Sequence, residues 1–184
     1  MVHLPRTALA LLACLLCLEV CTPLEAAGTK TADRCGVNRE QPPARIFADS
    51  DGKGWREYKT VKEIPELQLN TGSAAFLWEG RDGNVLVATQ VSGEGFSAYT
   101  DYCFDRSRTL VQLRFELRTA WGWGFREEGP FSRGTLKAAT SEYFSTETEK
   151  AIAKPEEAGD IPEALKPLIY SQEPKLPFFK LLSK

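Results

Sequence analysis

Apolar and polar side chains alternate most regularly along residues 111–118. Val111, Leu113, Phe115 and Leu117 take the odd positions, and polar residues take the even ones. Successive side chains of a β-strand point to opposite faces, so this pattern predicts a strand with one buried face and one face in water.

Shorter β-prone runs surround this strand and are separated by turn residues. The expected strands are residues 45–48, 73–79, 84–90, 96–104 and 135–144. Asp82-Gly83 is a strong hairpin signal, and we expect Gly129-Pro130 to turn the chain into the last run. Short consecutive strands predict an α+β, β-rich fold: a single antiparallel meander sheet of about five to six strands, with short flanking helices.

Two segments carry helical signals. Residues 55–63 are expected to form a short helix that stops before Pro65. Residues 160–169 begin with a capping pattern and share one apolar face, although Pro167 should end or kink that helix. The apolar residues 176–179 suggest that the proline-rich tail packs on the sheet.

The amino terminus has the three zones of an export signal. Arg6 supplies a positive charge, residues 8–18 form an apolar stretch, and residues 22–27 resemble a cleavage region. The apolar stretch would cover roughly 17 Å as a helix, well short of the ~30 Å hydrocarbon core. We therefore expect a signal peptide at residues 1–27, no transmembrane span in the mature chain, and export to the periplasm or the extracellular space.

The remaining chain is expected to comprise an extended arm at 28–44 and one globular domain at 45–184. A lipid anchor is the alternative to simple cleavage. Acylation at Cys14 would leave an unusually short apolar stretch, and Val20 is bulky for the residue before a cut at Cys21.

Cysteine usage supports an oxidising compartment. Of the five cysteines, Cys14, Cys17 and Cys21 belong to the leader, which leaves Cys35 and Cys103. An even pair in an exported chain predicts a structural disulfide that pins the arm to the sheet. Cys35 and Cys103 are far apart in sequence and do not form a C-x-x-C motif, so a redox-active pair is the weaker interpretation.

Histidine usage narrows the chemistry. The single histidine is His3, inside the leader, so the mature protein has no imidazole. This excludes Ser-His-Asp and Cys-His nucleophiles and histidine-ligated zinc, and we expect no cofactor and no metal. Removing Arg6, Glu19 and Glu25 with the leader leaves 22 basic and 23 acidic side chains, so no excess of positive charge points to nucleic acid.

Aromatic residues alternate with glycine at Trp121, Trp123 and Phe125. A straight strand from residue 109 to 125 would span roughly 55 Å, so the glycines should introduce a bend or bulge. The three rings then either continue the core face or form a platform for a sugar, an apolar group or a peptide. Trp78 and Tyr99, and also Trp55, are candidates for the same surface if the sheet brings them near.

Two other groups of residues suggest a chemical role. The segment 49–54 resembles a calcium loop, but Lys53 occupies a ligand position and Thr60 stands where a bidentate glutamate belongs, so we predict a plain turn. Carboxylates could act without histidine. The candidates, with the tyrosines close to them in sequence, are Asp101, Asp105, Glu127, Glu128, Tyr99 and Tyr102.

The sequence alone does not determine a function. The preferred hypothesis is a non-catalytic exported domain that binds an unknown protein, a sugar or an apolar ligand through an aromatic surface. The alternatives are a hydrolase or lyase that uses carboxylates and tyrosine, and a structural envelope protein or lipoprotein.

Overall fold

A computed structural model describes residues 35–49, 52–65, 72–159, 165 and 168–183. The expected signal peptide and both candidate lipidation sites lie outside the described residues. So does most of the helix expected at 160–169.

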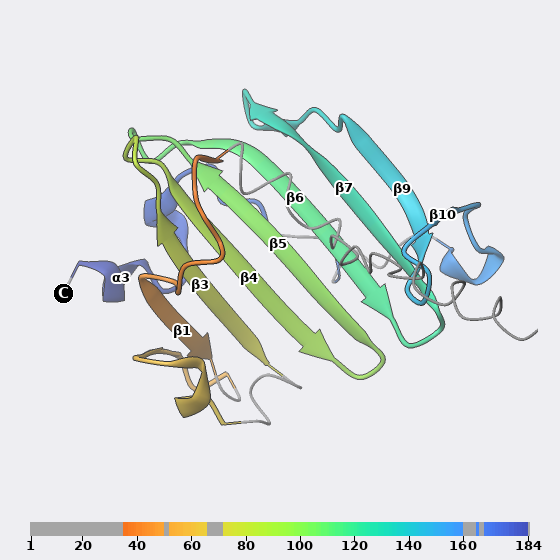
Figure 1. Cartoon of the computed structure of the whole chain (residues 1–184), viewed down its shortest axis with the longest axis horizontal. Helices are drawn as coiled ribbons and strands as arrows, with labels where there is room; N and C mark the ends of the chain where they lie inside the picture. The colour runs from red at the N-terminus through yellow and green to blue at the C-terminus, as the bar shows by residue number, and fades with distance from the viewer. Residues whose placement is uncertain (1–34, 50–51, 66–71, 160–164, 166–167, 184) are drawn as a thin grey trace, which may run out of the picture.

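The described chain folds as one antiparallel ten-stranded sheet (Figure 1). Its strands are β1 (Arg45–Asp49), β2 (Trp55–Tyr58), β3 (Ser73–Glu79), β4 (Val85–Gly93), β5 (Phe96–Phe104), β6 (Leu110–Thr119), β7 (Trp123–Ser132), β8 (Thr135–Leu136), β9 (Thr140–Ser145) and β10 (Ala151–Ile152). The order across the sheet is β10-β9-β7-β6-β5-β4-β3-β1-β2, with β8 paired to β7. Strands β3 to β7 form the expected meander, and β1 and β2 extend it beyond β3.

The β-rich antiparallel sheet is confirmed, but the expected count of five to six strands is wrong. Strands β2 and β10 carried no periodic signal of their own. The expected strand 135–144 divides into β8 and β9, and β7 was not expected as a separate strand. The helix expected at 55–63 is also wrong: β2 pairs with β1, and only Val61–Glu63 (η1) forms a 3₁₀ turn. The backbone of β2 bonds to the edge of β1, and this pairing overrides a weak helical spacing.

The last hairpin turns at a different place from the one expected. Strand β7 runs through Gly129-Pro130, and the chain reverses at Arg133-Gly134, where φ is +52° and +77°. Ser132 pairs with Thr135, so Arg133 and Gly134 form a two-residue turn. Both have positive φ, which suits a tight hairpin. Gly129 has another role, because a Cβ there would collide with the carbonyl oxygen of Lys137.

The glycine at 122 marks a turn and not a bulge. Strand β6 ends at Thr119, the chain turns through residues 120–122, and Gly122 has φ +85°. In place of the expected bend or bulge, the chain from 109 to 125 contains a turn between two antiparallel strands, β6 and β7.

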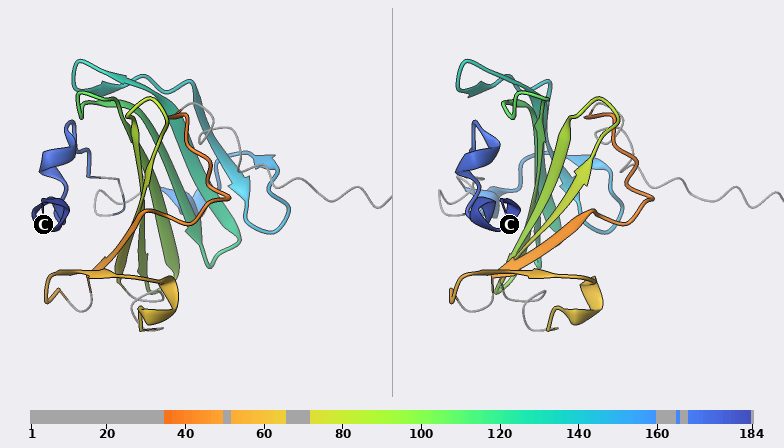
Figure 2. Two further views of the ribbon diagram at one scale, coloured as in Figure 1. Left: turned by 60° about the vertical axis from the view of Figure 1, so that its left-hand side comes forward. Right: turned by 90° about the vertical axis from the view of Figure 1, so that its left-hand side faces the viewer.

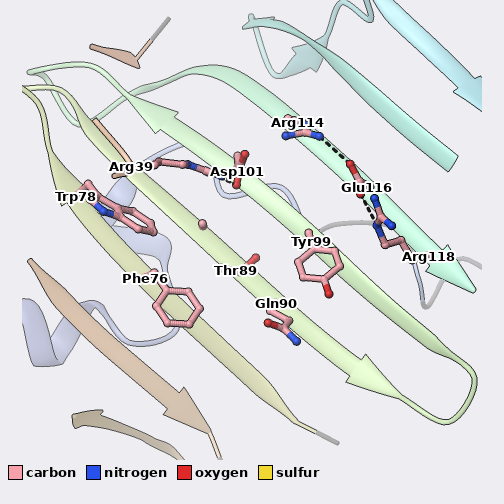
Figure 3. A pocket seen from close by; sticks show the side chains of 11 residues that line it. Arg39, Phe76, Trp78, Thr89, Gln90, Tyr99, Asp101, Arg114, Glu116 and Arg118 are labelled. Carbon is pink, nitrogen blue, oxygen red and sulfur yellow. Dashed lines mark hydrogen bonds and ion pairs between the residues drawn. The ribbon is translucent and has the colours of Figure 1, made fainter. Parts of the chain in front are cut away.

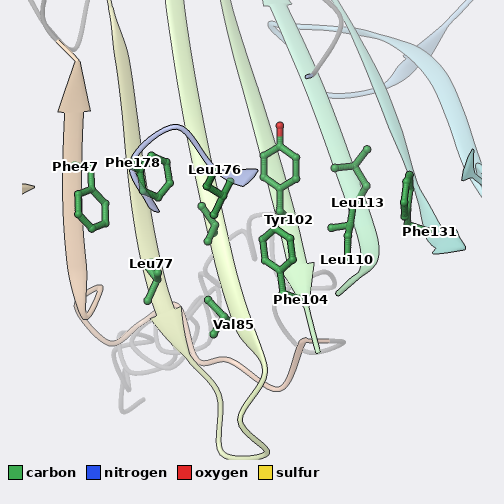
Figure 4. Packing of buried hydrophobic residues seen from close by; sticks show 12 residues of the cluster. Phe47, Leu77, Val85, Tyr102, Phe104, Leu110, Leu113, Phe131, Leu176 and Phe178 are labelled. Carbon is green, nitrogen blue, oxygen red and sulfur yellow. The ribbon is translucent and has the colours of Figure 1, made fainter. Parts of the chain in front are cut away.

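One face of the sheet carries the main apolar core (Figure 4). The C-terminal segment covers it with η4 (Glu173–Lys175) and α3 (Phe179–Leu182), and both Leu176 and Phe178 are fully buried. The Phe178 ring stacks on Phe47 with centroids 4.7 Å apart. No helix in the described part of the chain has the length and apolar character needed to cross a membrane.

The N-terminal arm lies on the opposite side of the sheet from the C-terminal segment (Figure 2). The predicted pairing of Cys35 and Cys103 is confirmed, with Cα atoms 5.7 Å apart. Both cysteines are buried beside Val37 and Leu86. The disulfide thus fastens the start of the arm to β5.

Candidate functional site

The face of the sheet opposite the C-terminal segment has polar side chains at its centre, and two small buried apolar clusters, one around Cys35 and one around Ile46, lie on the same face. Pairing across the strands sets its side chains in rows. One row is Phe76, Ala88, Asp101 and Arg114; the next is Gln90, Tyr99, Glu116 and Arg126. These residues come from β3 to β7, and strand alternation points them all to one side.

A hollow of about 360 Å³ lies over these rows (Figure 3). Ala88 sits between Phe76 and Asp101 in the pairing, and its methyl group leaves space that larger neighbours border. The lining residues are Arg39, Phe76, Trp78, Ala88, Thr89, Gln90, Tyr99, Asp101, Arg114, Glu116 and Arg118. The hollow therefore exists because Ala88 has a small side chain and its neighbours on this face have large ones.

The N-terminal arm closes one end of the hollow. Arg39 Nη2 lies 2.5 Å from Asp101 Oδ1, and its guanidinium lies over the Trp78 ring, 5.5 Å from the centroid. The Trp78 indole donates a hydrogen bond of 2.9 Å to the carbonyl oxygen of Gln41, also in the arm. Because Cys35 is bonded to Cys103, these contacts are held close to β5.

The other end of the hollow is a charged network. Glu116 accepts hydrogen bonds of 2.7 Å from both Arg114 and Arg118. Arg118 also contacts Glu149, at 2.8 Å. Burial lowers the pKa of Arg118, but the hydrogen bonds to Glu116 and Glu149 outweigh it and the net shift is upward. Arg118 therefore stays a cation, and the network fixes the wall of the site.

The five aromatic residues singled out in the sequence divide between two places. Trp78 and Tyr99 line the hollow, and Tyr99 is 37 % exposed. Trp123 is buried on the apolar face, where Phe125 packs against the same cluster. Trp121 lies in the turn after β6, 68 % exposed, and stacks on Trp123 at 6.4 Å. The three-ring stripe is thus partly core and partly surface.

The candidate carboxylates and tyrosines divide as well. Asp101 lies at the hollow, whereas Asp105 lies in an exposed turn, where hydrogen bonds from Ser107 and Thr109 lower its pKa. Tyr102 faces the apolar side and donates a hydrogen bond of 2.6 Å to the Leu168 carbonyl; burial raises its pKa above the usual range.

The two remaining candidates are neighbours on β7. Glu127 pairs with Phe115 across the strands, and Glu128 accepts a 3.0 Å hydrogen bond from Gln112. In the segment that resembles a calcium loop, Asp49 Oδ1 accepts a hydrogen bond from the Gly54 amide; Ser50 and Asp51 lie outside the described residues. Within the described ranges, no group of three histidine, cysteine or acidic side chains could hold a metal ion.

Several lining residues were missed from the sequence. The alternation along 111–118 already predicts that Arg114, Glu116 and Arg118 share one face of a strand, so these three could have been identified from the sequence. No sequence signal marked Ala88 or Arg39, because their roles depend on cross-strand register and on the path of the arm.

A second cavity, of about 410 Å³, lies on the apolar face. The sheet contributes Thr100, Tyr102 and Phe115 to its wall, and the C-terminal segment contributes Leu168 and Tyr170. Residues 166–167, next to Leu168, lie outside the part of the chain that the structure describes.

No family model, no curated protein and no solved structure matches this chain. The geometry of the hollow is therefore the basis for inferring a function.

Proposed function

We propose that the protein is an exported, non-catalytic binding domain that holds a small ligand on the open face of its sheet. The observation that carries this proposal is the hollow over Ala88, bordered by aromatic rings and by a charged network that is already paired. A concave site with apolar walls and a few oriented polar groups is the usual form of a small-molecule site.

Two features support export. Residues 1–27 have the zones of a signal peptide. The disulfide between Cys35 and Cys103 belongs to oxidising compartments outside the cytosol. The periplasm and the extracellular space both satisfy these features.

The state of the carboxylates favours binding over catalysis. Hydrolysis by a carboxylate pair requires one member to donate a proton. Asp101 contacts Arg39, and Glu116 lies between Arg114 and Arg118, so both carboxylates of the hollow are already engaged in ion pairs within the protein. The hydrolase is the second candidate because Asp101, Glu116 and Tyr99 line one hollow. Product analysis after incubation with a bound ligand would detect it.

Filling the hollow tests the proposal directly. Ala88→Phe places a ring in the space, and Val111→Phe adds the same ring at an exposed position outside it. Thermal unfolding is followed with a panel of neutral sugars, uronic acids, amino sugars, amino acids and laurate. A ligand of the site raises the Tm of the wild type and of Val111→Phe but not of Ala88→Phe. Equal shifts in all three proteins, or no shift with any panel member, contradict the proposal.

A further inference from the structure

We infer that the ligand of the Ala88 hollow is a neutral carbohydrate of one or two rings. This inference rests on the proposed function, because it names the ligand class for the same site. Three properties of the hollow lead to it: its exposed rings, its paired charges and its size.

The rings in the hollow suit an amphipathic ligand. Tyr99 is 37 % exposed and Phe76 is half-buried, so both offer flat apolar surface at the edge of the space over Ala88. A pyranose ring has one face made of C–H groups and a rim of hydroxyls. Its C–H face can cover an aromatic ring while its rim reaches polar groups, an arrangement in which tyrosine is well suited to a wet site.

The charges of the hollow disfavour a charged ligand. Its lining contains three arginines and two carboxylates, and each carboxylate is already in contact with arginine. An anion that took the place of Glu116 on Arg114 or Arg118 would leave this carboxylate, whose side chain is 11 % exposed, without its partner. A cation that bound Glu116 would in the same way displace Arg114 or Arg118 from this carboxylate.

Hydroxyl groups avoid this conflict because they need only the hydrogen-bond donors and acceptors that the ion pairs leave unused. A guanidinium has five N–H donors, and a carboxylate has about four lone-pair sites. Arg114 reaches Glu116 through one nitrogen, Nη2, so this ion pair uses only part of the donor capacity of its guanidinium. A hydroxyl both donates and accepts, so a row of hydroxyls can bridge Arg114 and Glu116 without separating them.

The volume of the hollow limits the size of the ligand. About 360 Å³ lies near the small end of the range for ligand sites, about 300–1,000 Å³. One or two sugar rings fit this space. The ion pairs hold the polar groups in place before binding, which reduces the ordering cost of recognition.

Calorimetric titration with matched sugars tests the ligand class. Glucose, galactose, N-acetylglucosamine and their disaccharides are compared with glucuronate, which adds a negative charge, and with glucosamine, which adds a positive one. We expect at least one neutral sugar to bind about tenfold more tightly than its charged counterparts, a difference of about 1.4 kcal/mol.

Substitutions of Tyr99 test whether the sugar binds in the hollow. Tyr99→Ser should weaken the neutral sugar about tenfold or more, Tyr99→Phe should weaken it less, and Val111→Ala should leave it unchanged. Thermal unfolding of each variant shows that the fold is intact. If Tyr99→Ser loses the fold, Ala88→Phe replaces it as the test.

The outcomes separate this inference from the proposed function. A charged sugar, amino acid or laurate that binds in place of neutral sugars, and is lost in Ala88→Phe, overturns the carbohydrate inference but supports a binding site. Binding of neutral sugars that Ala88→Phe leaves unchanged overturns the assignment to this hollow. Absence of binding by every probe overturns both.

Discussion

The two faces of the central sheet are built from the same strands but are organised in opposite ways. On one face, apolar side chains pack beneath the C-terminal segment, and Leu176 and Phe178 are fully buried. On the other, arginines and carboxylates form ion pairs around the hollow, beside two smaller buried apolar clusters, and the arm from Cys35 closes one end of the hollow. Strand alternation produces this division, since neighbouring residues of one strand belong to different faces.

The comparison indicates where stability and recognition reside. Burial of apolar surface stabilises by about 25 cal/mol per Å², whereas partly exposed ion pairs contribute about 0–1 kcal/mol each. We therefore expect substitutions on the covered face to unfold the protein and those on the open face to alter binding with little loss of stability. Substitutions on each face test this division.

The largest effect is expected for Phe178→Ala. The Phe178 side chain is 1 % exposed and stacks on Phe47, so its removal leaves a cavity between the segment and the sheet. Loss of a buried phenylalanine costs about 3–5 kcal/mol of unfolding free energy. Urea unfolding monitored by circular dichroism measures the change. Phe179→Ala, at a half-buried neighbour, should cost clearly less; equal losses would contradict this account of the covered face.

The next effect concerns the disulfide. Cys35 and Cys103 are 68 residues apart, and closing such a loop stabilises by about 4 kcal/mol in the chain-entropy model. The double variant Cys35→Ser/Cys103→Ser should lose about 2–4 kcal/mol in urea unfolding. It should also weaken ligand binding, because Arg39 is no longer held over Trp78.

A thiol titration provides the control for the disulfide. The mature protein, denatured without reductant, should contain no free thiol. Two titratable thiols would show that the pair is not formed, and the loss in the double variant would then need another cause.

The third effect depends on pH and again separates the faces. Burial raises the folded-state pKa of Tyr102, so folding favours its neutral form. This stabilisation is complete below the unfolded pKa of about 10 and is lost as the pH rises above it, by up to about 1.4 kcal/mol per pH unit. Urea unfolding between pH 9 and 11, roughly the window around that pKa, should show the decline.

Matched tyrosine variants identify the source of that decline. Tyr102→Phe should flatten the pH dependence, and at neutral pH it should cost about 1 kcal/mol because the hydrogen bond to Leu168 is lost. Tyr99→Phe, on the open face, should leave the slope as in the wild type. An unchanged slope in Tyr102→Phe would assign the decline to another group, such as Tyr170, whose pKa burial also raises.

The sequence predicted most of the central sheet because its pattern is local. The expected strands 73–79 and 96–104 coincide with β3 and β5. Along β6, Leu113, Phe115 and Leu117 are buried as expected, but Val111 is 38 % exposed. The register shifts here, because Phe104 pairs with Leu110 while Cys103 pairs with Gln112, and Val111 is the extra residue.

The site was less predictable because it depends on pairings between distant segments. Trp78 and Tyr99 were candidates, but the hollow exists because β4 places Ala88 between Phe76 and Asp101. The aromatic stripe shows the same limit. Leu117 pairs with Phe125, so Phe125 returns to the apolar side, and this depends on the length of the turn at 120–122.

The smallest effect on stability is expected on the open face, for Glu116→Gln. This change keeps the shape of the side chain and removes the anion between Arg114 and Arg118. Because the arginine side chains are 19 % and 35 % exposed, water screens the remaining repulsion, and we expect a loss of about 1 kcal/mol or less. The loss should shrink between about 0.1 M and 1 M salt, as the Debye length falls from about 10 Å to 3 Å.

Ligand binding is the sensitive measurement for the same variant. Glu116→Gln frees positive charge in the hollow, so glucuronate should bind more tightly relative to glucose than it does in the wild type. Gln112→Glu is not a suitable control because Gln112 contacts Glu128, whereas Glu57→Gln removes one partner of the separate pair with Arg45, outside the hollow. If Glu116→Gln unfolded the protein as readily as Phe178→Ala, the open face would be part of the stabilising core, and the division between the two faces would be wrong.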